Sequence, residues 1–231
     1  MSLDVPKISA LVLDVLGTIV DERGHRLAET RSALEAAGES AEPADALVDA
    51  WLDRIDELMP EAGGQEFRPM DELNREALDA AAESAGAALR GSALDDLAAA
   101  ALVPRPWPDA APGLGALAER FNTVALSNST ARALIEIARG GGLRWHAALP
   151  TELVRCYKPD PAAYRLVLDL LRAGEGEVLM VAAHPWDLRA AAAQGMRTAY
   201  VKREGCPDAD GEFDVESTSL AALAAELLAT E

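Results

Sequence analysis

The sequence predicts an α/β fold in which a parallel sheet, covered by helices on both faces, is interrupted by an all-helical insertion. Three observations support this. Residues 8–15 (ISALVLDV) form a short apolar run rich in β-branched residues, which is typical of a buried strand. Residues 21–104 contain helical patterns with little strand character. From residue 114 onward, helical and strand patterns alternate, as expected for a parallel sheet.

The insertion contains four segments in which apolar residues recur with helical spacing. Leu47, Trp51, Ile55 and Leu58 lie on one face of such a helix, which predicts burial of that face. The expected helices are residues 27–37, 43–58, 70–85 and 93–102.

A proline-rich stretch, PRPWPDAAPG (residues 104–113), has four prolines and is predicted to be a linker. The alternating part of the chain follows it. Helices are expected at residues 114–120, 131–139, 161–172 and 186–194, and strands at 123–126, 147–149, 178–183 and 198–201. The predicted organisation is therefore a core of residues 1–20 and 105–231 and a helical domain of residues 21–104.

Composition restricts the possible partners and the compartment. The formal net charge of −18 disfavours binding to nucleic acid or to an anionic membrane. Its simplest consequence is solubility, and an anionic substrate would need a locally positive site. Cys156 and Cys206 imply no disulfide framework and fit a reducing compartment. Because there is neither a signal-like stretch nor an apolar run of roughly 18 residues, we expect a cytoplasmic protein.

Polar residues follow several of the predicted strands. In a parallel sheet, ligands bind outside the carboxyl ends of the strands, so these residues are expected to meet on one rim. They are Asp14, Thr18, Ser127, Asn128, Lys158, His184 and Asp187.

Asp14 closes the first strand and could simply cap the loop that follows. Gly17 allows a tight turn there, and Thr18 brings a hydroxyl near the carboxylate, so Asp14 is also a candidate covalent nucleophile. Ser127 and Asn128 precede a predicted helix. They could cap that helix or help its free N–H groups to bind an anion.

Lys158 lies between a strand and a helix in CYKPDP, where two prolines stiffen the loop. A fixed ammonium there could neutralise the nucleophile or an anionic substrate. Tyr164, in the following helix, is equally explained by core packing. His184 alone would be structural in most proteins, whereas Asp187 could be a favourable acid in the first turn of a helix or a general base.

Taken in order, these segments resemble the motifs of the haloacid dehalogenase superfamily. LVLDVLGTIVD is similar to its first motif, LSNS to its second, YKPDPAAY to its third and VAAHPWDLRAAAAQGMRTAYVKR to its fourth. The resemblance spans nearly the whole core, which it implies is Rossmann-like, and it implies that the helical insertion is the family's cap domain.

Two departures from the superfamily's phosphatases narrow this resemblance. Those enzymes carry a second Asp two residues after the nucleophile, where this chain has Leu16, and an acidic metal ligand where this chain has Ala183. Mg²⁺ requires several oxygen ligands, so no metal and no other cofactor is expected. The departures resemble the L-2-haloacid dehalogenases (type II), whose halide leaving group needs no proton.

The resemblance to that branch implies a mechanism. Asp14 attacks C2 of a short 2-haloalkanoic acid and expels halide, and water activated near Asp187 then hydrolyses the aspartyl ester. Lys158 and Thr18 would hold Asp14. Substrate would be bound by residues that include an arginine of the cap for the halide, for which Arg54 is the nearest candidate. The implied substrate-binding set is Leu16, Ser127, Asn128, Tyr164, His184 and Arg54.

Three functions stay open at this point. The first is a metal-independent (S)-2-haloacid dehalogenase, a cytoplasmic hydrolase with a covalent intermediate. The second is a hydrolase of the same superfamily acting on another small substrate, such as a phosphatase. The third is a catalytically inactive relative that serves as a binding protein. The presence of Asp14, Lys158 and Asp187 together argues against this third function. A homodimer is possible, with apolar helices of the cap at the interface.

Overall fold

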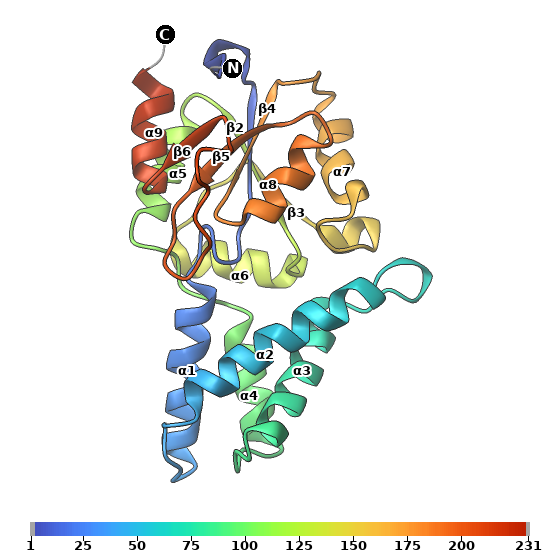
Figure 1. Cartoon of the computed structure of the whole chain (residues 1–231), viewed down its shortest axis with the longest axis vertical. Helices are drawn as coiled ribbons and strands as arrows, with labels where there is room; N and C mark the ends of the chain where they lie inside the picture. Colours follow the sequence, from blue (N-terminus) through green and yellow to red (C-terminus); the bar gives the residue numbers. More distant parts are fainter. Residues whose placement is uncertain (1–2, 230–231) are drawn as a thin grey trace. The chain divides into compact units, whose positions relative to one another are not determined.

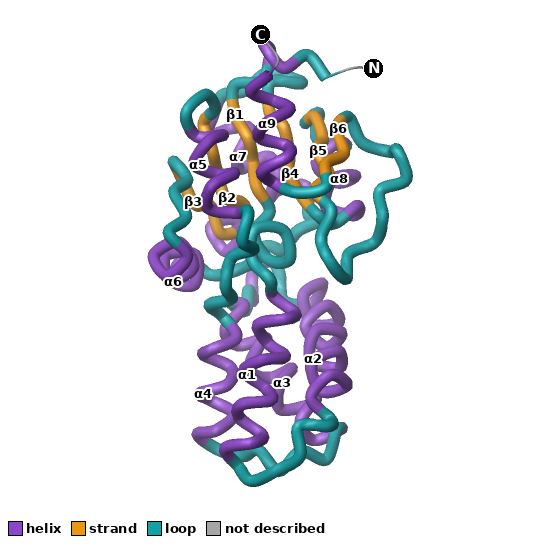
Figure 2. Tube along the Cα trace, turned by 90° about the vertical axis from the view of Figure 1, so that its left-hand side faces the viewer, coloured by secondary structure: helices purple, strands orange, loops and turns teal. Residues whose placement is uncertain are grey.

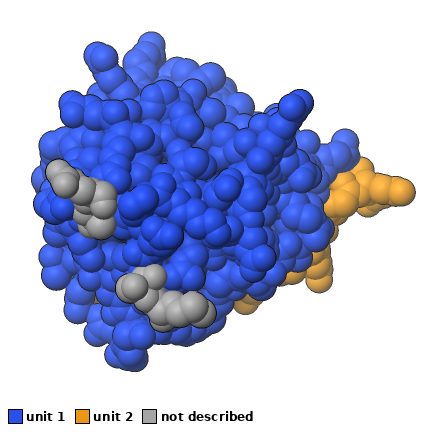
Figure 3. Space-filling model, turned by 90° about the horizontal axis from the view of Figure 1, so that it is seen from above, with its two compact units in different colours: residues 1–20, 106–231 blue, residues 21–105 orange. Residues whose placement is uncertain are grey.

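The computed structural model describes residues 3–229, and the chain forms two compact units, distinguished by colour in Figure 3. We call residues 1–20 with 106–231 the core unit, and residues 21–105 the helical unit. The boundary lies within one residue of the limits expected for the helical insertion. All the strands of the described chain belong to the core unit (Figure 2).

The core unit is built on one six-stranded parallel sheet, which confirms the predicted α/β class. The strands are β1 (Ala10–Leu13), β2 (Asn122–Ser127), β3 (Ala147–Pro150), β4 (Val178–Ala182), β5 (Arg197–Val201) and β6 (Val215–Ser217). Their order is β3-β2-β1-β4-β5-β6. Because β1 and β4 lie in the centre, covered on both faces, each of their residues is buried, and each reads as a continuous apolar run.

Helices cover both faces of this sheet (Figures 1 and 2). On one face, α7 and α8 contribute Tyr164, Val167 and Leu188 to a cluster with alternate residues of the central strands. On the other face, α5 and α9 pack against each other. The helices are α5 (Ala110–Ala118), α6 (Ala131–Gly141), α7 (Pro161–Leu171), α8 (Pro185–Ala192) and α9 (Leu220–Ala229), with 3-10 turns η1 (Val5–Lys7) and η4 (Thr151–Val154).

The helical unit consists of four α-helices whose apolar faces meet. Pairs α2 with α3 and α1 with α4 pack closely. The helices are α1 (Glu22–Ala36), α2 (Ala44–Leu58), α3 (Met70–Ser84) and α4 (Ser92–Ala101), with 3-10 turns η2 (Met59–Glu61) and η3 (Gly64–Glu66). The periodic stripe noted in the sequence is the buried face of α2, where Trp51 is completely enclosed.

A buried cation lies inside the helical unit. Arg26 donates to Asn74 Oδ1 (2.7 Å) and to Glu22 Oε1 (3.1 Å). Its guanidinium carbon lies 4.4 Å from the centroid of the Trp51 ring. Asn74 is held in turn, since its side chain donates to Ala98 O and its carbonyl accepts from Trp51 Nε1. This network ties α1, α2, α3 and α4 together.

The structure corrects the expected linker at residues 104–113. Helix α5 begins at Ala110, so the last part of that stretch is helical. Pro112 lies in the first turn, where an N–H group has no intrahelical partner, and its ring therefore breaks no hydrogen bond. The structure also adds β6 and α9, for which no element was predicted.

Candidate active site

A cluster of ionisable side chains gathers at the carboxyl ends of β1 and β4. Asp14 follows β1 directly, and its amide donates to Val181 O of β4 (3.0 Å), which continues the sheet by one residue. Gly17 then turns the chain with a φ of 74°, so that Thr18 lies back against Asp14. The Asp14 carboxylate is almost completely buried, with 4% of the residue exposed.

Lys158 joins two carboxylates. Its ammonium nitrogen lies 2.7 Å from Asp14 Oδ1 and 2.5 Å from Asp187 Oδ2. All three side chains are buried. Burial alone would lower the pKa of Lys158, but the two adjacent carboxylates raise it above its usual value, so that the ammonium stays charged.

The second oxygen of Asp14 also has partners. Asp14 Oδ2 accepts a hydrogen bond from Thr18 Oγ1 (2.6 Å) and lies 3.0 Å from His184 Nδ1. Burial would raise the pKa of Asp14, yet the charges and hydrogen bonds of Lys158 and His184 hold it well below its usual value. Asp14 is therefore ionised throughout the neutral range, as a carboxylate nucleophile must be.

Asp187, at the start of α8, faces the opposite side of the ammonium. Its Oδ1 accepts from Tyr164 Oη at 2.6 Å, so Tyr164 links α7 to the site. Burial raises the pKa of Asp187, and the nearby Asp14 charge raises it further, although Lys158 opposes both effects. A carboxyl with a raised pKa can accept and return a proton, as a general base does.

Asn128 of the second motif (LSNS) contacts the loop that carries Lys158. Asn128 Oδ1 accepts from the backbone N–H of Lys158 (2.7 Å), and its amide donates to Lys158 O (3.3 Å). Asn128 therefore orients the lysine loop. The buried Ser127 hydroxyl accepts from Ser129 N, and the helix cap of α6 is Thr130, whose hydroxyl accepts from Ala133 N.

The residues at this site do not fit a magnesium ion. The space between the two carboxylates is filled by the Lys158 ammonium, and neither Leu16 nor Ala183 has a side-chain oxygen. Among residues 3–229, no group of three or more His, Cys, Asp or Glu side chains is arranged to hold a metal ion. The hydrogen bonds of Asp14 are met by the protein's own donors.

Two of the residues singled out in the sequence take no part in the hydrogen bonds just described for this cluster. Leu16 is half-buried and forms an isolated bridge with Val20. Arg54 belongs to the helical unit, on α2, where its guanidinium lies 2.8 Å from Glu57 and 3.8 Å from Glu76. Its positive charge is thus partly offset by these two acids, and its expected role toward halide stays a prediction.

Sequence reasoning missed three neighbours of His184. The Cys206 side chain, from the loop between β5 and β6, interacts with His184 and helps to raise the pKa of the imidazole. The Trp186 ring is tilted by 30° to the imidazole, with 5.7 Å between the ring centroids, and its centroid lies 5.9 Å from the Lys158 ammonium. Gly17 leaves the space that the imidazole fills, since a Cβ there would lie 2.8 Å from His184 Cε1. Gly17 and Trp186 lie inside motifs and so carried a signal in the sequence, whereas Cys206 did not.

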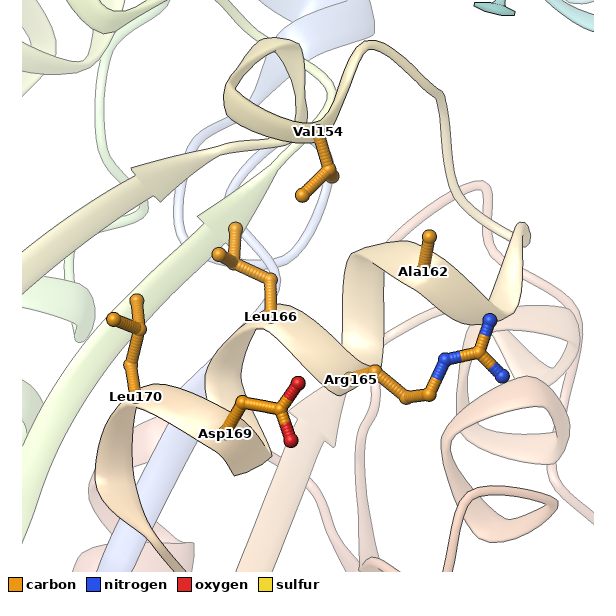
Figure 4. A pocket seen from close by; sticks show the side chains of 6 residues that line it. All are labelled: Val154, Ala162, Arg165, Leu166, Asp169 and Leu170. Carbon is orange, nitrogen blue, oxygen red and sulfur yellow. The ribbon is translucent and has the colours of Figure 1, made fainter.

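A hollow of about 370 Å³ on the core unit lies away from this cluster. Apolar side chains of α7 and η4 line it, together with Arg165 and Asp169 of α7 (Figure 4). It contains no nucleophile paired with a base. The buried cluster of Asp14, Lys158 and Asp187 is therefore the candidate active site of the core unit.

Comparison with known families identifies relatives of the whole chain. The family model described as haloacid dehalogenase-like hydrolase matches residues 8–195. The (S)-2-haloacid dehalogenase 1 of Pseudomonas sp. (strain CBS-3) is 29% identical over 204 residues, which is 87% of this chain and 87% of that enzyme.

Solved structures agree with the family match. The L-2-haloacid dehalogenase PA0810 is 31% identical with a TM-score of 0.88, over 96% of this chain and 100% of that one. The defluorinating L-2-haloacid dehalogenase Rha0230 is 32% identical with a TM-score of 0.87, over 96% and 95% of the two chains. The similarity thus includes both units of the chain.

Proposed function

This chain belongs to the haloacid dehalogenase-like hydrolases, and from that membership we propose that it is a metal-independent hydrolytic dehalogenase of short 2-haloalkanoic acids. One observation carries the proposal. The Asp14 carboxylate is held ionised by Lys158, Thr18 and His184, while no acid stands at Leu16 to protonate a leaving group. Such a nucleophile suits a leaving group that departs as a stable anion.

The proposed reaction has two steps. An oxygen of Asp14 attacks C2, the carbon–halogen bond breaks with its electron pair on the halide, and C2 inverts. Water then attacks Cγ of the aspartyl ester while Asp187 accepts its proton, and the 2-hydroxy acid leaves. The proton returns from Asp187 to the departing alkoxide. The second proton of the water, left on the new Asp14 carboxyl, is released to solvent, so that Asp14 is regenerated as a carboxylate.

The remaining assignments follow from this proposal. Ser127, Asn128 and nearby backbone groups are proposed to bind the substrate carboxylate, and Leu16, Tyr164 and His184 to line the rest of the substrate site. The similarity to the two L-2-haloacid dehalogenase structures and to the Pseudomonas enzyme supports the substrate class. We propose a cytoplasmic enzyme that can form a homodimer and that uses no cofactor, nucleic-acid partner or membrane partner. The two free cysteines are consistent with a reducing compartment. No helix among residues 3–229 combines the length and the apolar character that crossing a membrane requires.

The direct test is chloride release from L-2-chloropropionate, with and without EDTA. Release that resists EDTA supports the proposal. If chloride is absent and a generic phosphate ester is hydrolysed in a metal-dependent reaction, the chain is a phosphatase instead. If both substrates are left intact and the protein binds another protein tightly, it is an inactive binding relative.

Arg54 provides a separate test of the halide site. Arg54→Ala is expected to lower the rate of halide release by about 10-fold or more, as loss of a charged hydrogen bond does. Arg31→Ala is the matched control, because Arg31 is also an exposed arginine of the helical unit paired with an acid, Asp45. Equal activity of the two variants would place the halide site elsewhere.

A further inference from the structure

The loop that follows the nucleophile contains a turn whose backbone carbonyls lie outside any helix or strand. The turn consists of Gly17, Thr18 and Ile19. Thr18 and Ile19 are completely buried, so water does not reach them. Because a buried carbonyl without a partner costs free energy, the carbonyls of this turn need donors from elsewhere in the chain.

Two residues of the core unit provide these donors. Trp107, which precedes α5, donates from its indole Nε1 to Gly17 O (3.2 Å) and from its backbone N–H to Ile19 O (3.0 Å). Arg203, which follows β5, donates from Nε to Thr18 O (2.8 Å). The Trp107 indole and Arg203 are 90 and 185 positions away in the sequence from the carbonyls they bind, so the turn is held by tertiary contacts.

Arg203 is itself fixed in place. Its Nη1 donates to Asp109 Oδ1 (2.8 Å), and its guanidinium carbon lies 5.4 Å from the centroid of the Trp107 ring. The other oxygen of Asp109 accepts from the backbone N–H of Leu220, at the start of α9 (2.6 Å). The guanidinium thus joins a carbonyl of the turn to an anchored carboxylate. The rigid fork of an arginine suits such a double contact, whereas lysine offers a single point of charge.

The turn held in this way carries Thr18, whose hydroxyl lies 2.6 Å from the Asp14 carboxylate. Reactions of a positioned nucleophile are sensitive to small shifts, since a misplacement of about 1 Å can slow them about 10²-fold. We propose that Arg203 and Trp107 are positioning residues of the active site, which fix the turn of residues 17–19 against Asp14. This inference rests on the proposed function, because the effect on turnover presupposes the reaction at Asp14.

Trp107→Phe is the first test. It removes the indole N–H that binds Gly17 O and keeps an aromatic ring beside Arg203. We expect kcat with L-2-chloropropionate to fall by about 5–10-fold and KM to change by less than about twofold, because the turn positions the nucleophile. Chloride release over a range of substrate concentrations measures both constants, and thermal melting confirms that the variant is folded.

Trp51→Phe is the matched control. The Trp51 indole also donates to a backbone carbonyl, Asn74 O (2.9 Å), but it does so inside the helical unit. This variant should have a lower melting temperature and a kcat within about twofold of wild type. Equal losses of kcat in Trp51→Phe and Trp107→Phe would show that reduced stability causes both, and would overturn the inference.

Arg203→Lys tests the second positioning residue. It keeps a positive charge beside Asp109 and loses the fork, so kcat should fall by about 10–10²-fold. If Arg203 acts through the turn that carries Thr18, the two residues should be coupled. In a Thr18→Val background, Arg203→Lys should therefore lower kcat further by less than about twofold. Losses that simply multiply in the double variant would contradict the proposed route.

Hydrogen–deuterium exchange of a peptide that spans residues 14–20 gives a readout that does not depend on catalysis. Exchange should be about fivefold faster in Trp107→Phe and Arg203→Lys, and unchanged in Trp51→Phe, because loss of a bond favours local opening of the turn. Unchanged exchange and full chloride release in both core variants would refute this inference alone. A wild-type protein that releases no chloride refutes the proposed function, and the positioning role in catalysis falls with it.

Discussion

Each unit of this molecule buries a cation, and the two cations have different companions. In the core unit, Lys158 lies between the carboxylates of Asp14 and Asp187. In the helical unit, Arg26 is enclosed by an amide, an indole face and the carboxylate of Glu22. The first surrounding contains the proposed nucleophile and the proposed base, whereas the second contains one partly exposed acid, Glu22.

The difference separates a reactive site from a structural one. The pKa values of Asp14 and Asp187 depend on each other and on the Lys158 charge between them. A change in the charge of one group therefore shifts the pKa of the others. The partners of Arg26 mostly do not titrate, and they link four helices. Loss of the core cluster should therefore remove activity with little effect on folding, and loss of the Arg26 cluster should do the reverse.

The largest expected effect is that of Asp14→Asn. Turnover should fall by about 10⁴-fold or more, since the covalent step loses its nucleophile. The fold should persist, because Lys158 keeps Asp187 as its partner. Halide release and thermal melting measure the two quantities. A variant that loses activity only because it unfolds would remove the distinction between the two clusters.

Oxygen labelling tests the same nucleophile directly. In a single turnover of the wild-type enzyme in heavy-oxygen water, the first product should contain no label, because its oxygen comes from Asp14. Label should then be found on Asp14 and in the products of later cycles. Label in the first product would mean that water attacks the substrate itself.

The next largest effect is expected for Asp187→Asn. Loss of a general base typically slows its step by about 10²–10⁴-fold, and here the aspartyl ester should accumulate. Intact mass spectrometry after mixing with L-2-chloropropionate detects this. Tyr164→Phe, which removes only the hydroxyl bonded to Asp187, should have a smaller effect, and equal losses in both variants would argue against Asp187 as the base.

Arg26→Met tests the structural cluster. It leaves Glu22 without its buried partner, and we expect the free energy of unfolding to fall by about 2–4 kcal/mol. The kcat of the folded protein should stay within about twofold of wild type. Urea unfolding and activity assays check both values, with Arg31→Met as an exposed control that should change stability by about 0.5 kcal/mol or less. A strong loss of kcat would contradict the division of roles.

The smallest effect concerns pH. His184 has a pKa raised to about 10 in the folded protein, against about 6.5 unfolded. A raised pKa contributes stability that is fully present below pH 6.5 and is lost as pH rises toward 10. The stability difference between wild type and His184→Gln should therefore shrink over this range, as measured by melting temperature. Because Asp14 and Cys206 face the ring, Cys206→Ser controls for thiol ionisation, and a constant difference would contradict the pKa shift.

The central strands could be predicted because β1 and β4 are buried on both faces and read as unbroken apolar runs. The edge strand β6 has three residues and gives too short a pattern. Helix α9 was predictable, because Leu220, Leu223 and Leu227 recur with helical spacing and are buried. The start of α5 could not be predicted, because a proline such as Pro112 is equally compatible with a linker and with the first turn of a helix.

For the site, strand ends and motifs indicated which side chains would meet. They did not indicate how the oxygens of Asp14 are shared among donors, because that depends on rotamers and loop geometry. Cys206 illustrates the limit. It reaches His184 from a loop between β5 and β6 that has no periodicity, so only the folded chain brings it there.

The lysine shared between Asp14 and Asp187 has a consequence for the order of events in the proposed reaction. While Asp14 is a free anion, its charge helps to raise the pKa of Asp187 and makes it more readily protonated. Alkylation neutralises Asp14, so this repulsion ends and the whole attraction of the ammonium falls on Asp187. Alkylation of Asp14 therefore favours the ionised form of Asp187, which is the form that accepts a proton, at the step in which there is an ester to hydrolyse.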